Sequence, residues 1–159
     1  MAARLEYGKL APEGMEKMRA LEHWLNAEAG LERALLELVR LRASLMNGCE
    51  YCIGLHTGEL KKLNEPEGRI AGVAEWRGSD AYTERERAAL EWAEAVTDIQ
   101  QGHAPDAVWE KVREHFTDAE AVELTLAIAT INAWNRIAIA LGDYPGHAGR
   151  HDASGFVTA

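Results

Sequence analysis

Four residues with the chemistry of a thiol redox site lie between positions 37 and 56. The chain has two cysteines, Cys49 and Cys52; His56 follows four residues after the second, and Glu37 precedes the first by twelve. On an α-helix, Cys49, Cys52 and His56 fall within roughly 60° of arc and therefore share one face. Two thiols at this spacing can close into a disulfide, which indicates a redox pair in which one cysteine attacks and the other resolves.

The two cysteines differ in what would favour the reactive thiolate. Cys49 is predicted at the N-terminus of a helix and Cys52 in its first turn, where the backbone dipoles favour negative charge. This argument ranks Cys49 first, whereas the imidazole of His56, one turn after Cys52, favours Cys52. The residues alone leave open which cysteine attacks.

Glu37 reaches this face only if the chain turns back. In one continuous helix Glu37 would lie about 18 Å from Cys49, out of reach. The pair Asn47-Gly48 is a turn signal and is expected to end the helix just before Cys49. If the next helix folds back against the first, Glu37 can approach the cysteine face and accept a proton.

Other interpretations of these residues stay open. Two cysteines with a histidine and a glutamate can bind zinc, although three ligands on one helix lack the second loop that usually closes a structural site. Free cysteines are also commonly buried in a core without any reactivity. Glu37 alone would as often be a solvated helix carboxylate, and His56 alone as often a core histidine.

The rest of the chain has helical periodicity and no sustained strand alternation, which predicts an all-α fold of about six or seven helices. Residues 1–11 are expected to be an irregular lead-in, and 143–159 a tail. Capping boxes are expected at Thr83/Glu86 and Thr117/Glu120. The predicted helices run from Pro12 to Gly30, about Leu31 to Leu45, Cys49 to about Leu63, Pro66 to Trp76, Thr83 to near Gly102, Pro105 to Phe116, and Thr117 to Leu141.

The last of these helices is apolar on nearly every side, so we expect it to be buried on several sides, within the domain or between subunits. We expect residues 1–159 to form a single domain with a core from about 12 to 142. The longest uncharged apolar stretch in the C-terminal half, Leu124 to Asn135, is too short to span a bilayer, and no membrane association is expected.

Composition limits the function and the compartment. A net charge of −9 without a basic run argues against nucleic-acid binding. The first residues lack the apolar region of a signal peptide, and two cysteines do not make a secreted disulfide scaffold, so the cytoplasm is expected. No flavin, haem or nicotinamide motif is visible, which predicts no cofactor and a partner thiol as the electron source.

With these residues in view, the chain resembles the alkylhydroperoxidase AhpD/carboxymuconolactone decarboxylase superfamily, and its AhpD-like branch in particular. The resemblance rests on Glu37, Cys49, Cys52 and His56 at the spacing of that branch, within RASLMNGCEYCIGLH. A second match is INAWNRIAIA, from Ile131 to Ala140. Together the matches extend from about Leu31 to Leu141.

The resemblance implies an all-helical domain that assembles as a homotrimer or homohexamer and reduces alkyl hydroperoxides. It implies that Cys52 attacks the peroxide through a sulfenic acid and that Cys49 resolves it to a disulfide. Glu37 and His56 would form a proton relay, and an external dithiol or thiol protein would reduce the disulfide. The alternatives are a lyase of the decarboxylase branch that needs no cysteine, and a zinc-binding or redox-sensing module without turnover.

Two further features bear on this resemblance. AhpD proper has a histidine just before the second cysteine, where this chain has Tyr51, a difference that concerns peroxidase strength and the choice of reductant. Asn132, Asn135 and Arg136 lie on the last predicted helix. Interhelix or capping hydrogen bonds are their expected role, with a place in the site or an interface as the alternative.

Overall fold

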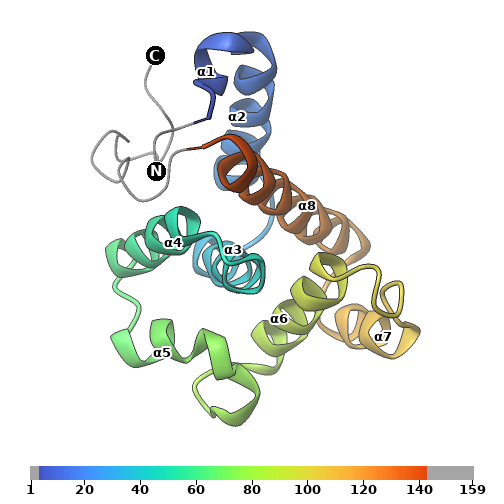
Figure 1. The fold of residues 1–159 in the computed structure, drawn as a ribbon. Coiled ribbons are helices and arrows are strands. Elements are labelled where there is room, and N and C mark those ends of the chain that lie inside the picture. Colours follow the sequence, from blue (N-terminus) through green and yellow to red (C-terminus); the bar gives the residue numbers. More distant parts are fainter. Residues whose placement is uncertain (1–3, 143–159) are drawn as a thin grey trace.

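The described part of the chain is entirely helical. The computed structural model describes residues 4–142, and within them there are eight α-helices, one 3₁₀-helix and no strand, so the predicted all-α class is confirmed. The elements are α1 (Tyr7–Leu10), α2 (Pro12–Ala27), α3 (Arg33–Asn47), α4 (Glu50–Lys62), α5 (Glu67–Gly72), η1 (Val73–Gly78), α6 (Glu84–Thr97), α7 (Asp106–His115) and α8 (Asp118–Leu141) (Figure 1). The predicted tail, 143–159, lies outside the described residues.

Two differences explain why there are more helices than predicted. The expected irregular lead-in contains the short helix α1. The helix expected from Pro66 to Trp76 is divided into α5 and η1, and Glu75 inside η1 has non-helical angles (φ −119°, ψ 32°). A single turn and a local kink of this kind leave no periodic signal in the sequence.

The helix ends follow their local signals closely in most places. Pro12 occupies the first turn of α2, and Gly48 ends α3 in the left-handed conformation, with φ 67°. Thr83 and Thr117 both form the predicted capping boxes. The main error is the end of α6, which stops at Thr97 rather than near Gly102.

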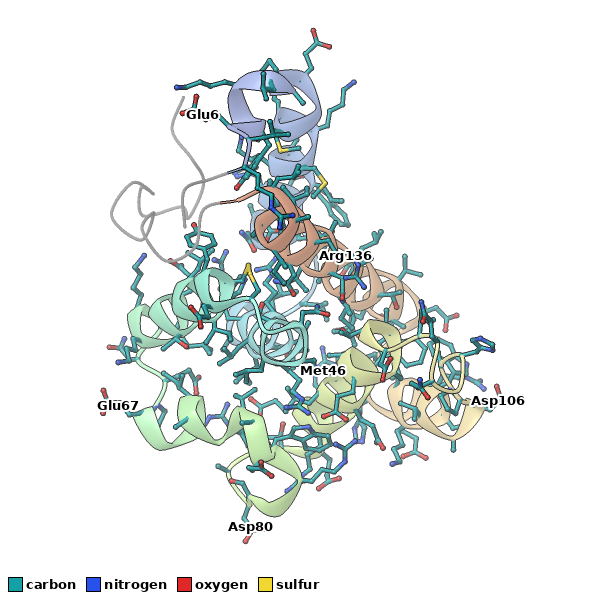
Figure 2. The ribbon with its side chains drawn as sticks, in the orientation of Figure 1. Glu6, Met46, Glu67, Asp80, Asp106 and Arg136 are labelled. Carbon is teal, nitrogen blue, oxygen red and sulfur yellow. A yellow bond between two sulfur atoms is a disulfide. The ribbon has the colours of Figure 1, made fainter. Side chains whose placement is uncertain are left out.

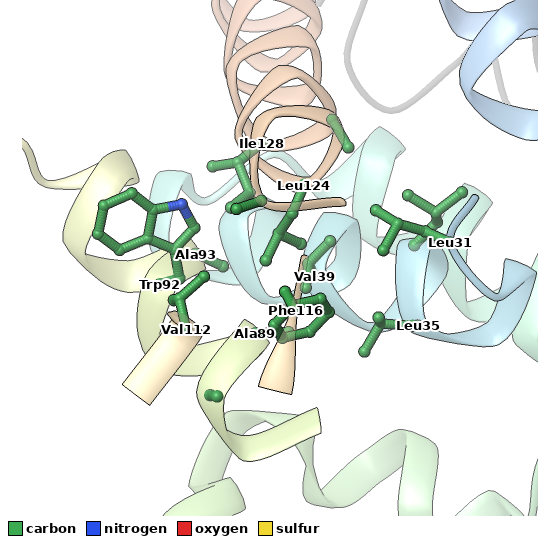
Figure 3. Close-up of a cluster of buried hydrophobic side chains, with 14 of the residues drawn as sticks. Leu31, Leu35, Val39, Ala89, Trp92, Ala93, Val112, Phe116, Leu124 and Ile128 are labelled. Atoms are coloured by element: carbon green, nitrogen blue, oxygen red, sulfur yellow. The ribbon is translucent and has the colours of Figure 1, made fainter. Parts of the chain in front are cut away.

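Helix α3 occupies the centre of the arrangement, and α4, α6 and α8 pack around it (Figure 1). The largest hydrophobic cluster joins α2, α3, α6, α7 and α8 (Figure 3). Leu36, Val39, Leu124 and Ile128 are fully buried in it, and burying such a side chain stabilises a fold by about 1.5–3 kcal/mol. A second cluster joins α3 and α4 to α5, η1 and α6.

Helix α8 is long and apolar enough to cross a membrane by length and composition alone, a property that the shorter stretch 124–135 did not reveal. Core helices pass the same test, and α8 packs against α2, α3 and α6. The expected burial holds for its inner face, which includes Leu124 and Ile131, but Val122 and Leu126 on another face are 61% and 37% exposed. Helix α8 is therefore a core helix with an open apolar face.

Candidate functional site

A left-handed turn brings the four predicted site residues together. The backbone N–H groups of Gly48 and Cys49 donate to the carbonyl of Ser44, which closes the end of α3. Cys49 is the N-cap of α4, and α4 runs back along α3. As a result Nδ1 of His56 lies 2.7 Å from Oε2 of Glu37, the approach that the sequence made conditional on this turn.

Cys49 and Cys52 are bonded to each other as a disulfide at the start of α4. Their Cα atoms are 5.3 Å apart, and the two residues are 0% and 3% exposed. A small hydrophobic cluster surrounds them, with residues from α3, α4 and α8: Ala43, Tyr51, Ile131, Trp134 and Ala138. A pair at this separation can alternate between dithiol and disulfide with little movement of the helix.

Glu37 is an ionised carboxylate in a buried position. Its side chain is 1% exposed, and Oε1 accepts a hydrogen bond from Nη1 of Arg40 at 2.7 Å and forms a 3.0 Å ion pair with Arg33. Burial alone would raise the pKa of this carboxyl. The hydrogen bond with His56 and the positive charges of His56, Arg40 and Arg33 outweigh burial and lower the pKa to about 2.

The two ring nitrogens of His56 have different surroundings. Nδ1 faces Glu37, whereas Nε2 is buried and has no hydrogen-bond partner among the described residues. A carboxylate on one nitrogen orients an imidazole and stabilises the charge that it gains when the other nitrogen takes up a proton. Because His56 lies one turn after Cys52, this arrangement can move a proton near the cysteine pair.

Two arginines that were not predicted from the sequence hold Glu37. Arg33 and Arg40 lie four residues before and three after Glu37 on α3, so each is one turn away, and that spacing could have revealed them. Arg40 is itself 1% exposed. Its other partners come from α2: Oδ1 of Asn26 accepts from Nη1 at 2.8 Å, and Oε1 of Glu22 pairs with Nη2 at 2.6 Å.

Buried acids are exceptional in this acidic chain. Figure 2 labels four acidic residues at the periphery, Glu6, Glu67, Asp80 and Asp106, and all four are exposed. Glu37 and Glu22, in contrast, are 1% and 6% exposed. No local pattern marks Glu22 as different from its exposed neighbours on α2.

The polar residues of α8 fasten the turn that carries Cys49. Nδ2 of Asn47 donates to Asn132 at 2.9 Å and to Asn135 at 2.8 Å, and Asn135 donates in turn to Ser44 at 3.1 Å. Arg136, which Figure 2 labels on α8, donates to the side chain and backbone oxygens of Asn132. The expected role in interhelix hydrogen bonding is therefore confirmed for the two asparagines.

The zinc alternative lacks a ligand set in the part of the chain that the structure describes. Within residues 4–142 no three histidine, cysteine or acidic side chains lie close enough together to hold a metal ion. The two cysteines are paired with each other, and Glu37 and His56 are paired with each other.

Comparisons with known proteins give matches in both sequence and fold. The sequence pattern of the carboxymuconolactone decarboxylase family matches residues 10–95, which include all four site residues. The uncharacterised protein YdfG of Bacillus subtilis is 41% identical over 143 residues, 90% of this chain and 97% of that protein.

Solved structures share the same arrangement of helices. A protein of unknown function from Agrobacterium tumefaciens, proposed there to be the antioxidant defence protein AhpD, superposes with a TM-score of 0.84 at 42% identity, covering 87% of this chain and 94% of that one. An uncharacterised peroxidase-related protein from Ralstonia eutropha with an alkylhydroperoxidase AhpD core gives 0.75 at 26%, covering 86% and 72%. A cysteine-to-alanine variant of the debrominase Bmp8, in complex with 2,3,4-tribromopyrrole, gives 0.79 at 21%, covering 88% and 74%, and shows the fold alone.

Proposed function

The chain belongs to the AhpD/carboxymuconolactone decarboxylase superfamily, and on that premise we propose that it is a thiol-dependent peroxidase that reduces alkyl hydroperoxides. The observation that carries the proposal is the buried Cys49–Cys52 disulfide on the same helix as His56, whose ring Glu37 holds. A redox-active pair needs two bondable sulfurs and a group that can accept a proton, and both are here.

The proposed cycle balances with the residues of this site and one external reductant. The Cys52 thiolate attacks the O–O bond, so that an S–O bond forms, the O–O bond breaks, and the alkoxide leaves as an alcohol after taking a proton. The Cys49 thiol then attacks the sulfenic sulfur, forming the disulfide and releasing water. An external dithiol or thiol protein reduces the disulfide and is itself oxidised, which suits a cytoplasmic setting.

Glu37 and His56 serve as the proton relay in this proposal. Nε2 of His56 takes the thiol proton when Cys52 becomes the thiolate and returns a proton to the leaving oxygen. Glu37 stays ionised throughout, because its lowered pKa of about 2 lies far below any working pH. Its charge stabilises the imidazolium that exists between the two transfers.

The proposal is tested on the intact reduced protein. After the reductant is removed, one equivalent of an organic hydroperoxide is added, and the intact mass is measured within seconds. We expect a rapid loss of two hydrogens as Cys49 and Cys52 close into a disulfide. An unchanged mass would refute the peroxidase proposal and turn attention to the lyase alternative, whose activity should survive the loss of both cysteines.

We also propose that the chain forms a homotrimer or homohexamer through the open face of α8. Val122, Leu126 and Ala129 are exposed and lie four and three residues apart, so they form an apolar stripe on the first half of the helix, and the exposed Arg136 follows farther along the same face. Exposed apolar patches with a polar rim often mark sites of protein–protein contact. In a symmetric oligomer the same face of a second copy can pack against it and bury it.

We expect Leu126→Glu to shift the assembly toward monomers, because it places a charge in the centre of the stripe. Size-exclusion chromatography with light scattering measures the mass of each species. Leu63→Glu is the matched control, since Leu63 is 39% exposed at the end of α4 and should leave the mass unchanged. A wild-type protein that is monomeric at all concentrations would contradict the proposal.

A further inference from the structure

Three helices contribute to one buried line of charges that ends at the proposed relay. It runs from Glu22 on α2 to Arg40 on α3, then to Glu37 on α3 and His56 on α4. We propose that Arg40, held by Glu22, is a positioning residue that sets the pH range in which the Glu37–His56 pair can take up a proton. This inference rests on the proposed function, because it concerns the working of the same site.

The contacts make Arg40 the link between α2 and the relay. Nη1 of Arg40 donates to Glu37 at 2.7 Å and to Asn26 at 2.8 Å, while Nη2 lies 2.6 Å from Glu22. Arg40 thus holds Oε1 of Glu37, which leaves Oε2 to face His56. The orientation of the carboxylate therefore depends on a side chain that is itself held by two residues of α2.

A contribution to folding stability does not by itself explain why these charges are buried. Removing a guanidinium and a carboxylate from water costs several kcal/mol per ion, and well-packed apolar side chains in their place are often as stable. Arg40 is also imperfectly satisfied, because its Nε is buried and has no hydrogen-bond partner in the described part of the chain. The electrostatic effect of the network on Glu37 and His56 explains it better.

Its charges act on the relay through Glu37. A carboxylate facing His56 alone would hold a proton on the imidazole, because opposite charges close together favour the charged form. Arg40 shares the negative charge of Glu37, and Arg33 does so at 3.0 Å from the more exposed side. The two arginines therefore weaken the attraction of Glu37 for a proton on the imidazole, while Oε2 of Glu37 still orients the ring.

Two further carboxylates, one on α4 and one on α2, contact these arginines. Glu59 on α4 lies 3.5 Å from Arg33 and also binds Lys62. Glu22 lies beyond Arg40, so its negative charge is farther from His56 than the positive charge that it holds. The two ends of the buried line should therefore have opposite effects on His56.

The test compares three variants in the reduced protein. Loss of a nearby positive charge raises the pH at which every neighbouring group gives up its proton, and loss of a negative charge lowers it. Glu22→Gln/Arg40→Met removes both charges together, avoids an uncompensated buried ion, and should raise the His56 titration midpoint by about one pH unit. Glu22→Gln alone should lower that midpoint by a smaller amount, and Arg40→Lys should keep it near the wild-type value.

The midpoint is measured by NMR on the carbon-bound ring protons of His56, assigned with His56→Gln. The pH profile of Cys52 alkylation, in a Cys49→Ser background, should shift in the same direction as the midpoint. Circular dichroism establishes that each variant is folded. The inference is wrong if Glu22→Gln and Glu22→Gln/Arg40→Met, both folded, leave the two profiles in place. It is also wrong if these two variants move the His56 midpoint in the same direction as each other.

Neither readout uses peroxide, so this inference and the proposed function can fail separately. Shifted profiles in a protein that does not react with peroxide would refute the peroxidase and retain Arg40 as the residue that sets the charge of the pair. Unshifted profiles in a protein that forms the disulfide with peroxide would refute the role of Arg40 and retain the peroxidase.

Discussion

Replacing Cys52 by serine is expected to abolish peroxide consumption, lowering turnover with a dithiol reductant by a factor on the order of 10³ or more. A serine hydroxyl at this position keeps the size of the side chain but is not ionised near neutral pH and cannot form a disulfide. Cys52 is 3% exposed in a close-packed cluster, so a substitution that preserves its volume should leave the fold intact. Peroxide loss is measured directly, with thermal unfolding as the check on folding.

Cys49→Ser is the matched control, because it removes the partner and leaves the proposed nucleophile. We expect this variant to gain one oxygen when peroxide is added and to stop there, since no thiol is present to resolve the sulfenic acid. A sulfenic-acid trapping reagent should then label Cys52. Full activity of Cys52→Ser would overturn the mechanism, and labelling of Cys49 in that variant would reverse the two roles.

Local sequence signals located most helix ends because their physical cause is local. The capping boxes at Thr83 and Thr117 and the left-handed Gly48 each satisfy backbone groups of the same short segment. The end of α6 was predicted too late because the helix ends at Thr97 with Asp98 as its C-cap, whereas the glycine taken as the end signal is Gly102. The following turn holds His103 and Ala104 at φ 52° and 51°, angles that those residue types do not signal.

The part of the candidate site that could be predicted from the sequence is the part that depends on the turn at Asn47-Gly48. Asn47-Gly48 indicated that α4 could fold back, and from this the contact between Glu37 and His56 followed. Arg40 could have been added, because it lies one turn from Glu37 on the same helix. Glu22 could not, because its approach depends on how α2 packs against the rest of the fold, and nothing in its own neighbourhood records that packing.

Glu37→Gln is expected to impair both the reaction and the fold. The amide keeps the shape of the side chain but carries no charge, which leaves Arg40 buried with only Glu22 to compensate it. Breaking a buried ion pair in this way typically costs about 3–5 kcal/mol of unfolding free energy. The rate of disulfide formation with peroxide should fall about 10²-fold or more, because His56 loses the group that orients it and stabilises its charge.

The same substitution should change how stability depends on acid. The pKa of Glu37 falls from 4.5 in a free side chain to about 2 in the folded protein. Because the folded value is the lower one, this carboxylate contributes fully above pH 4.5 and loses its contribution as pH falls toward 2. The difference corresponds to about 3 kcal/mol, and denaturant unfolding at a series of pH values measures it.

Glu67→Gln supplies the control, since Glu67 is exposed and should alter neither the rate nor the acid profile. In Glu37→Gln the fall in stability between pH 4.5 and 2 should be smaller than in the wild type by about 3 kcal/mol, because the titrating group is gone. A variant that keeps the wild-type acid profile would show that Glu37 is not held ionised in the fold. The relay would then lose its anion, and His56 would have to act without a charged partner.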